Sequence, residues 1–286
     1  MKNVEVKYNV NLKDYTTIKI GGIAKRLFLP KTQEEVKYII DNYHPIIIGE
    51  GSNVLFNDER TYDDVMVLKY FKEIKCIDDT IVASAGMRLI DVCLFALKEG
   101  LTDIEFAYGI PGSVGGAIIM NAGAYGGEVK DIVSEVVTTK TQYSNNQCLF
   151  GYRHSIFSDN GECVLYATFK LKRGNRLNIA KRMLELMEKR VLRQPLDKYS
   201  AGSTFKRGFN FYASKIIDEC GLRGYGTGDA KVSHKHTGFL INDGNATYRE
   251  FMKLVKEVQD HVFSKTGKRL ECEIKIFDWI HILLRY

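Results

Sequence analysis

An uncharged stretch of twenty-two residues, from Phe106 to Gly127, constrains the fold of this 286-residue chain more than any other feature. It contains seven of the protein's 25 glycines. Glycine has no Cβ and tolerates positive φ, so such a loop lets a ligand approach the main chain and leaves amides free to point at an anion. By itself the stretch fits a phosphate-binding loop and a buried turn equally well.

A membrane-spanning helix is a third interpretation of so apolar a stretch, and we reject it. Pro111, Ser113, Asn121 and the glycines make a poor helix for lipid. The central run, Ala117 to Met120, has only the length of a strand. We therefore expect no membrane partner.

Earlier in the chain, another glycine turn, Gly49 to Leu55, follows the short apolar strand Ile46 to Ile48. We call it the first glycine turn. A strand that leads into a tight turn presents amides and small polar side chains, here Ser52 and Asn53, at the strand end. The spacing matches neither the dinucleotide fingerprint nor the P-loop, so a Rossmann domain and an NTPase both lose support. Two separate glycine turns suit a long ligand with a diphosphate in its middle.

The composition is that of an ordinary globular protein, with 45% apolar and 27% charged residues, and the length allows two or three domains. The first thirty residues lack a secretory signal, and the six cysteines form no Cys-x-x-Cys pair. We expect a cytoplasmic protein with reduced, mostly buried thiols. His234 and His236 have no Cys or acidic partner in a zinc pattern, so we expect no metal.

The net charge of +6 is concentrated in one region of the sequence. Between Lys181 and His236, twelve Lys or Arg residues face six Asp or Glu residues, which accounts for the whole surplus. No helix-turn-helix, zinc-finger or stacking-aromatic pattern accompanies this charge, so we expect no nucleic acid partner. A small polyanionic substrate is the better fit, although a basic stretch can also be a solvated surface.

Local signals predict the main helices and strands. Thr32-x-x-Glu35 is a capping box that opens a helix, between a strand at 26–29 and the strand at Ile46, which makes a βαβ unit. Further strands are expected at 65–68, 80–84, 132–139, 164–171 and 238–242. Further helices are expected at 88–99, from Asn178 to the stop at Gln194-Pro195, at 212–220, and after the capping box Thr247-x-x-Glu250.

Six segments occur in the order found in the UDP-N-acetylenolpyruvoylglucosamine reductase family, flavoenzymes of peptidoglycan precursor synthesis. The chain resembles this family from about Thr16 to Ile276, and it resembles the shorter subtype, because the segment from Gln194 to Ser203 leaves no room for an extra Tyr-bearing loop. Cys272 departs from the usual pattern, and the apolar tail 277–286 matches nothing in the family. The six segments are 49–55, 109–127, 152–155, 201–207, 235–239 and 270–274.

The resemblance implies an α+β fold with a two-lobed FAD-binding region of the vanillyl-alcohol-oxidase type, followed by a smaller α/β substrate domain. We expect the lobes at 1–75 and 76–195 and the substrate domain at 196–286. Relatives with covalent flavin carry a His in the first glycine turn, which this chain lacks, so FAD is expected to be held noncovalently. The FAD contacts are assigned to Gly49, Gly51, Ser52, Asn53, Gly112, Ser113, Gly115, Gly116, Asn121 and Gly123.

The family reaction reduces the enolpyruvyl group of UDP-N-acetylglucosamine enolpyruvate to UDP-N-acetylmuramate, with NADPH as the electron source. The resemblance assigns the proton donor to Ser203, the carboxylate-polarising group to Arg153 and an assisting carboxylate of raised pKa to Glu273. Glu271 would share the strand face of Glu273, and Lys206 could supply positive charge near Ser203. The substrate contacts are assigned to Arg207, Lys235, His236 and Asn242, with Tyr125 and Arg223 as further candidates. A monomer is expected.

Two rival functions keep part of this pattern. A related flavin oxidase or dehydrogenase of another small alcohol or sugar would need the glycine loops but not the run Gly202 to Lys206. A flavin- or nucleotide-sugar-binding protein without activity would have no need of Ser203, Arg153 and Glu273 together.

Overall fold

The structure is a computed structural model that describes residues 4–278. These residues form two compact units, each assembled from three stretches of chain. The first unit comprises residues 4–7, 27–50 and 64–190, and the second comprises residues 8–26, 51–63 and 191–278. The predicted boundaries after residues 75 and 195 stay a prediction. Most of the predicted tail lies outside the described residues, which end at Asp278.

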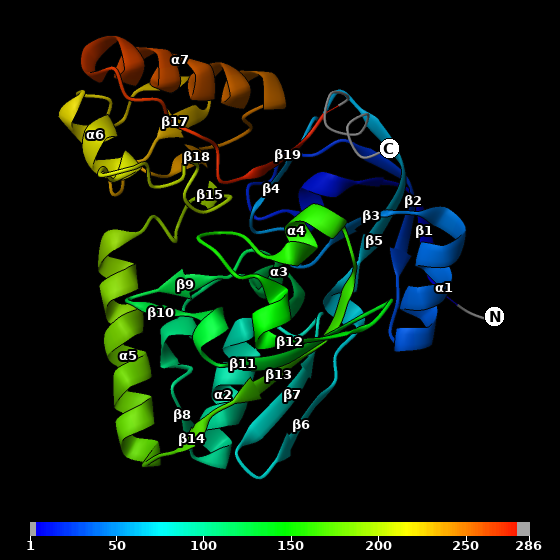
Figure 1. Ribbon diagram of the computed structural model, residues 1–286. Coiled ribbons are helices and arrows are strands. Elements are labelled where there is room, and N and C mark those ends of the chain that lie inside the picture. Colours follow the sequence, from blue (N-terminus) through cyan, green and yellow to red (C-terminus); the bar gives the residue numbers. More distant parts are fainter. Residues whose placement is uncertain (1–3, 279–286) are drawn as a thin grey trace. The chain divides into compact units, whose positions relative to one another are not determined.

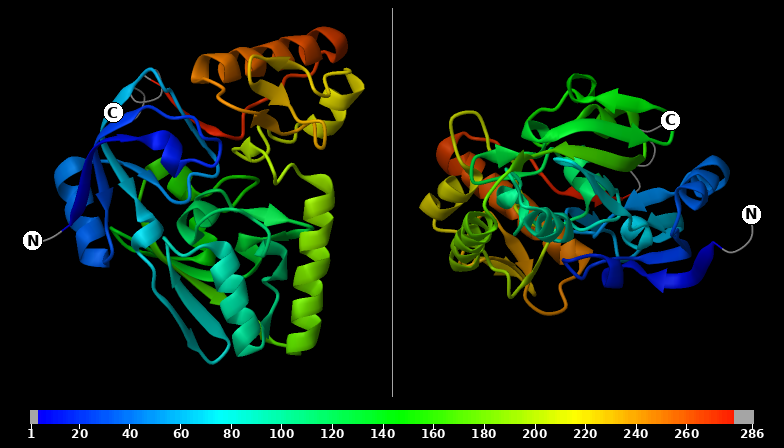
Figure 2. Two further views of the ribbon diagram at one scale, coloured as in Figure 1. Left: turned by 180° about the vertical axis from the view of Figure 1, so that it is seen from behind. Right: turned by 90° about the horizontal axis from the view of Figure 1, so that it is seen from below.

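The first unit is built on a five-stranded antiparallel sheet of order β12-β11-β13-β7-β6. The helix α3 packs against the central strands β13 and β7, and the turned views show α2 and α5 running side by side (Figures 1 and 2). The strands are β6 (Ile74–Ile77), β7 (Thr80–Ser84), β11 (Val133–Thr138), β12 (Gln142–Ser144) and β13 (Val164–Lys170). The helices are α1 (Gln33–Tyr43), α2 (Leu89–Glu99), α3 (Val114–Ile119), α4 (Ile156–Asn160) and α5 (Arg176–Arg193).

Smaller elements complete this part of the chain. Two strand pairs, β8 (Leu101–Thr102) with β14 (Lys172–Arg173) and β9 (Gly123–Ala124) with β10 (Gly127–Glu128), are antiparallel. A four-stranded sheet has the order β1-β2-β5-β3, in which β3 and β5 are parallel. Its strands are β1 (Glu5–Asn11), β2 (Ile23–Leu29), β3 (Ile46–Ile48) and β5 (Thr61–Val67), of which β1, β2 and β5 begin in residues of one unit and end in residues of the other. Short 3-10 turns lie at Leu12–Tyr15, Leu68–Tyr70, Glu105–Ala107, Val129–Asp131 and Asn145–Cys148.

The second unit places two helices with a four-stranded antiparallel sheet of order β15-β18-β17-β16 (Figure 1). The helix α7 contacts β16, β17 and β18 as well as α6. A separate parallel pair joins β4 to β19. The elements are β4 (Val54–Phe56), β15 (Tyr199–Ser200), α6 (Ala213–Glu219), β16 (Gly226–Thr227), β17 (Ala230–Val232), β18 (Leu240–Asn242), α7 (Tyr248–Thr266) and β19 (Lys275–Phe277).

The helix α7 shows how local sequence sets an element of the second unit. Thr247 caps its first turn, and the reciprocal bonds of the predicted capping box with Glu250 are both formed. Phe251, Leu254, Val255, Val258 and Val262 are buried at helical spacing, and Ile18, Ile20 and Leu55 from the other stretches of the unit join the same core. Gly267 ends the helix with a φ of 68°.

Two local predictions were wrong. The run Ala117–Met120, expected as a strand, lies mostly in the helix α3, because Ser113 caps its first turn and Val114, Ala117 and Ile118 bury one helical face. The long helix α5 begins at Arg176 rather than after Asn178. The side chain of Asn175 accepts from the amides of Leu177 and Asn178, so the earlier of two closely spaced asparagines takes the capping position.

The six cysteines carry free thiols, four of them buried, which confirms that prediction. Within residues 4–278, no helix is both long and apolar enough to cross a membrane.

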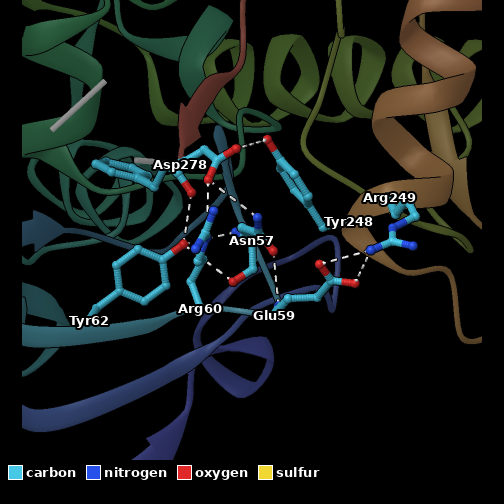
Figure 3. Close-up of polar contacts among 8 residues, drawn as sticks. Asn57, Glu59, Arg60, Tyr62, Tyr248, Arg249 and Asp278 are labelled. Atoms are coloured by element: carbon cyan, nitrogen blue, oxygen red, sulfur yellow. Dashed lines mark hydrogen bonds and ion pairs between the residues drawn. The ribbon is translucent and has the colours of Figure 1, made fainter. Parts of the chain in front are cut away.

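A network of polar side chains joins the ends of β4 and β19 in the second unit (Figure 3). The Tyr62 hydroxyl is buried, donates to the carbonyl of Phe277 at 2.8 Å and accepts from the amide of Asn57 at 2.9 Å. The Tyr248 hydroxyl donates to the Asp278 carboxylate at 3.2 Å. Burial raises the pKa of Tyr62, so its hydroxyl keeps its proton.

We expect Tyr62→Phe to lower the free energy of unfolding by about 0.5–1.5 kcal/mol, because it removes the hydroxyl that joins Asn57 and Phe277, while the direct bond from the Asn57 amide to Phe277 O at 3.2 Å remains. Urea denaturation followed by circular dichroism measures the change. Tyr8→Phe is the control, since Tyr8 is 69% exposed. Equal stabilities of the two variants would contradict the role of the Tyr62 hydroxyl.

Candidate active site

The two glycine segments meet inside the first unit, at Gly49 and Ser113. An ideal Cβ placed on Gly49 would lie 2.1 Å from Ser113 Oγ, so no other residue fits there without displacing the hydroxyl. That hydroxyl is buried and accepts from the Gly116 amide at 3.3 Å. Gly112, directly before Ser113, has a φ of 149°, which favours glycine. The bare backbone predicted from the sequence therefore exists, and its close approach fits a ligand held through the main chain.

The backbone amides of the glycine segment 109–127 are less free to bind a ligand than the sequence suggested. The Gly115 amide donates to Ala85 O at 2.9 Å, and the Gly116 amide is bound by Ser113. An ideal Cβ on Gly115 would lie 2.9 Å from Ala85 Cβ. Gly115 is thus explained by close packing inside the unit, and the donors for a phosphate must come from neighbouring positions.

Asn121, assigned to FAD, is fully buried, and its side chain forms hydrogen bonds with Gly151, Glu128 and Lys130. Its Nδ2 donates to Gly151 O at 2.9 Å and to Glu128 Oε2 at 3.1 Å, and its Oδ1 accepts from the Lys130 amide at 3.0 Å. The φ of Asn121 is 39°, a conformation that Asn tolerates better than most residues. Asn121 therefore fixes the segments on either side of the β9–β10 hairpin.

Arg153 lies on a tight turn beside that hairpin. Gly151 and His154 bond to each other across the turn, and Arg153 has a φ of 54°. Its Nη2 donates to Gly123 O at 3.2 Å, and its guanidinium lies 5.3 Å from the centre of the Tyr152 ring. A turn residue in the left-handed region is strained, and such strain is typical of a side chain held for function.

In the second unit, Thr204 links Ser203 to Glu273. It follows Ser203 in the chain, and its backbone bonds to that of Glu273. Thr204 O accepts from the Glu273 amide at 2.8 Å, and the Thr204 amide donates to Gly238 O at 2.9 Å. Asn53, from the first glycine turn, donates through Nδ2 to Glu273 O at 3.4 Å. Four of the six segments quoted above for the resemblance, 49–55, 201–207, 235–239 and 270–274, thus meet here.

Thr17 completes this cluster, and the sequence reasoning missed it. Its amide donates to Gly51 O at 3.1 Å, and its hydroxyl donates to Ser200 O at 2.6 Å. Gly51 has a φ of +66°, and an ideal Cβ on it would lie 2.0 Å from Tyr15 O. Thr17 therefore ties the first glycine turn to the start of the run that carries Ser203. The polar pair Thr16-Thr17 just before the apolar Ile18 was the available signal.

The two candidate carboxylates, Glu271 and Glu273, lie just before β19 rather than in a strand, and they differ in their surroundings. Glu271 forms an ion pair with Lys206, and its side chain is 73% exposed. Glu273 is partly buried. The positive charge of Lys206, which we had considered for Ser203, is thus already paired with Glu271. Glu271 is therefore occupied by an ion pair at the surface, and the role of Glu273 stays a prediction.

His236 is neutral near pH 7, because burial lowers the pKa of its imidazole. Its Nδ1 accepts from the Gly238 amide at 3.2 Å, so Nε2 carries the proton, and the ring meets Phe239 edge to face at 5.0 Å. His236 can therefore offer one hydrogen bond to a ligand but no charge.

Four other side chains were predicted to contact the substrate, and they differ in exposure and in hydrogen bonding. Arg207 and Lys235 are exposed, and the Arg207 guanidinium lies 6.0 Å from the Tyr212 ring centre. The Arg223 guanidinium donates two hydrogen bonds to the Asp218 carboxylate. Asn242 is buried, donates to Ile18 O at 3.0 Å and accepts from the Ala246 amide at 2.9 Å. Asn242 therefore has a structural role, and the assignment of Arg207 and Lys235 to the substrate stays a prediction.

Among the described residues, no group of three or more His, Cys, Asp or Glu side chains is arranged to hold a metal ion. Gly49 and Gly51 both admit only a bare backbone, because Ser113 Oγ and Tyr15 O lie where a Cβ would be. Their assignment to FAD stays a prediction.

We expect Gly49→Ala to lower the amount of bound FAD several-fold, because the added methyl group displaces Ser113 Oγ. The measurement is the flavin absorbance released into the supernatant by acid precipitation, which must also release the flavin of the unchanged protein if FAD is noncovalent. Gly151→Ala is the control, since its Cβ would meet nothing closer than 3.7 Å. Full flavin content in Gly49→Ala would refute this assignment.

Comparisons with known proteins agree with the two-part organisation. Residues 24–141 match the FAD binding domain family, and residues 194–277 match the UDP-N-acetylenolpyruvoylglucosamine reductase C-terminal domain family. The chain is 42% identical over 281 residues to the UDP-N-acetylenolpyruvoylglucosamine reductase of Clostridium tetani, covering 95% of this chain and 92% of that protein. It is 40% identical over 284 residues to that of Limosilactobacillus reuteri, covering 96% and 95%.

A solved structure agrees as well. The crystal structure of UDP-N-acetylenolpyruvylglucosamine reductase from Thermus caldophilus is 33% identical, covers 96% of this chain and 99% of its own, and superposes with a TM-score of 0.81. These findings confirm the predicted α+β fold, the FAD cofactor and the family. The chain belongs to the UDP-N-acetylenolpyruvoylglucosamine reductase family and is an FAD-dependent oxidoreductase.

Proposed function

We propose that this chain uses NADPH to reduce UDP-N-acetylglucosamine enolpyruvate to UDP-N-acetylmuramate, a step of peptidoglycan precursor synthesis. The observation that carries the proposal is the bond from the Glu273 amide to Thr204 O, which brings the Ser203 run, Glu273 and the first glycine turn into one cluster. A related oxidase would have no need of that cluster. The expected monomeric state and cytoplasmic location stay predictions.

When bound and reduced by NADPH, FAD would supply the two-electron chemistry, a hydride from flavin N5 to the β-carbon of the alkene. The protein's own residues then have to stabilise the negative charge that develops on the α-carbon and its carboxylate, and to protonate that carbon. We assign carboxylate binding to Arg153, whose planar guanidinium suits a carboxylate with developing enolate character. Its bond to Gly123 O holds the guanidinium in place.

Ser203 is proposed to donate the proton to the α-carbon. A serine hydroxyl is a weak acid, so it works only toward a strongly basic carbanion and from a fixed position. Its neighbour Thr204 provides that position, because its backbone is bonded to both Gly238 and Glu273. Glu273 is proposed to assist at the enolate, either by accepting a hydrogen bond or by holding a water.

The diphosphate and sugar of the substrate are proposed to meet the exposed Arg207 and Lys235, with His236 as a neutral hydrogen-bond donor. Arg223 is exposed too, but it is paired with Asp218. The flavin is proposed to be noncovalent.

We expect Ser203→Ala to slow protonation by about 10²–10⁴-fold while reduction of the flavin by NADPH stays within about twofold of the unchanged protein. Anaerobic stopped-flow absorbance measures both half-reactions, with UDP-N-acetylglucosamine enolpyruvate added to the reduced enzyme. Ser264→Ala on the exposed side of α7 is the control. If the unchanged enzyme stays reduced until oxygen enters, the substrate assignment fails and the rival oxidase gains support.

Glu273 and Glu271 offer a matched pair of substitutions in the segment just before β19. We expect Glu273→Gln to slow reoxidation of the reduced flavin by about 10²-fold, because it removes the assisting carboxylate. Glu271→Gln removes only an exposed ion pair with Lys206, so the rate of flavin reoxidation in that variant should change less than about twofold. Equal effects of the two substitutions, measured in the same stopped-flow experiment, would remove the special role of Glu273.

A further inference from the structure

The turn that carries Arg153 is short and strained. The amide of Gly151 donates to His154 O at 3.0 Å, the amide of His154 donates to Gly151 O at 3.4 Å, and Arg153 between them has a φ of 54°. So short a turn, with a non-glycine residue in the left-handed region, needs support from the surrounding structure. The reaction proposed above depends on Arg153, so the contacts that hold this turn decide where its guanidinium lies.

Ser155, two residues after Arg153, supplies one of these contacts. It is fully buried and stands at the N-cap of α4 with an extended backbone, at a φ of −150°. A serine in that position normally accepts from an amide of the first helical turn. Within residues 4–278, the Ser155 hydroxyl makes no such capping bond to α4 and instead donates to Ile119 O at 2.9 Å. The hydroxyl therefore joins the Arg153 turn to another element.

That element is the C-terminal end of α3. Ile119 is the last residue of α3, and the carbonyl groups of the last helical turn have no partner inside their own helix. Ser158 Oγ donates to the same carbonyl at 3.0 Å, so two hydroxyls satisfy one oxygen. Asn121, two residues after the helix, adds a second link, because its Nδ2 donates to Gly151 O at 2.9 Å. The Arg153 turn is thus held to the end of α3 from both sides.

The other end of α3 lies against the first glycine turn. Ser113 caps the helix, and its Oγ lies 2.1 Å from the position of an ideal Cβ on Gly49. The Gly115 amide donates to Ala85 O at 2.9 Å, which fixes the first turn of the helix to the residue after β7. The helix α3 therefore links a glycine assigned to FAD with the turn that carries Arg153.

We propose that Ser155 is a positioning residue for the reaction: by fastening the Arg153 turn to Ile119 at the end of α3, its hydroxyl sets where the guanidinium lies relative to the glycine positions assigned to FAD. The inference rests on the proposed function, because Arg153 is given its role there. Ser155 does not touch the substrate and acts only through Arg153. A small displacement of the guanidinium weakens its hold on a carboxylate in which charge develops.

A double-mutant cycle tests whether Ser155 acts through Arg153. We expect Ser155→Ala to slow reoxidation of the reduced flavin by the enolpyruvyl substrate about tenfold, and Arg153→Met to slow it about 10²–10³-fold. Adding Ser155→Ala to Arg153→Met should cost less than about twofold more, because no guanidinium is left to position. Anaerobic stopped-flow absorbance measures the rates. A tenfold loss in both backgrounds would overturn the proposal.

Ser158→Ala is the matched control. It removes a hydroxyl bond to the same Ile119 carbonyl and leaves the bond from Ser155 in place. Its rate of flavin reoxidation should stay within about twofold of the rate of the unchanged protein. A tenfold loss in this variant as well would assign the effect to the packing of α4 and count against a specific role of Ser155.

Hydrogen exchange of the Gly151 and His154 amides gives a readout without substrate. We expect both amides to exchange faster in Ser155→Ala and at an unchanged rate in Ser158→Ala. Unchanged exchange in Ser155→Ala would overturn the proposal even if activity falls. If Ser155→Ala does not fold, Ser155→Cys still decides, because a thiol fills the space of the hydroxyl and is only a weak donor. Absent reoxidation in the unchanged protein would defeat the proposed function and leave this measurement valid.

Discussion

The parallel pairing of β4 with β19 is the constraint on which the second unit depends. Val54 lies opposite Lys275, so Asn53 and Glu273 come together at the start of the pair. Parallel strands require a long connection, and here nearly the whole chain lies between the two partners. At the other end of the pair, the hydroxyl of the buried Tyr62 donates a hydrogen bond to the carbonyl of Phe277, the last residue of β19 (Figure 3). The position of Glu273 therefore depends on residues that are distant in sequence and have no part in the chemistry.

The glycines of this protein serve more than one physical purpose. Gly49 and Gly51 leave no room for a side chain because Ser113 Oγ and Tyr15 O already lie there. Gly115 lets α3 approach Ala85, and Gly109 makes space for Arg190. A glycine-rich segment thus reflects internal packing as well as ligand approach, and sequence alone does not separate these two causes.

Elements with strong local signals were predicted well. The strand at 80–84 is β7, the capping box at Thr247 opens α7, and Gly100 ends α2 in the left-handed conformation. The errors fell where the signal was short or duplicated. Six residues of α3 are too few for periodicity to separate helix from strand, and Asn175 and Asn178 offered two possible caps for α5.

The sequence by itself determined the helix and strand order of most elements and the family, because caps, glycine stops and ordered motifs are local patterns. It also pointed to Ser203, Arg153 and Glu273, through the motifs that carry them. Only the tertiary structure decided that Glu271 is paired with Lys206, that the Gly115 amide is already bonded to Ala85, and that Gly109 lies against the side chain of Arg190. Each of these depends on hydrogen-bond partners chosen by packing between segments that are far apart in the chain, and no local pattern records such a choice.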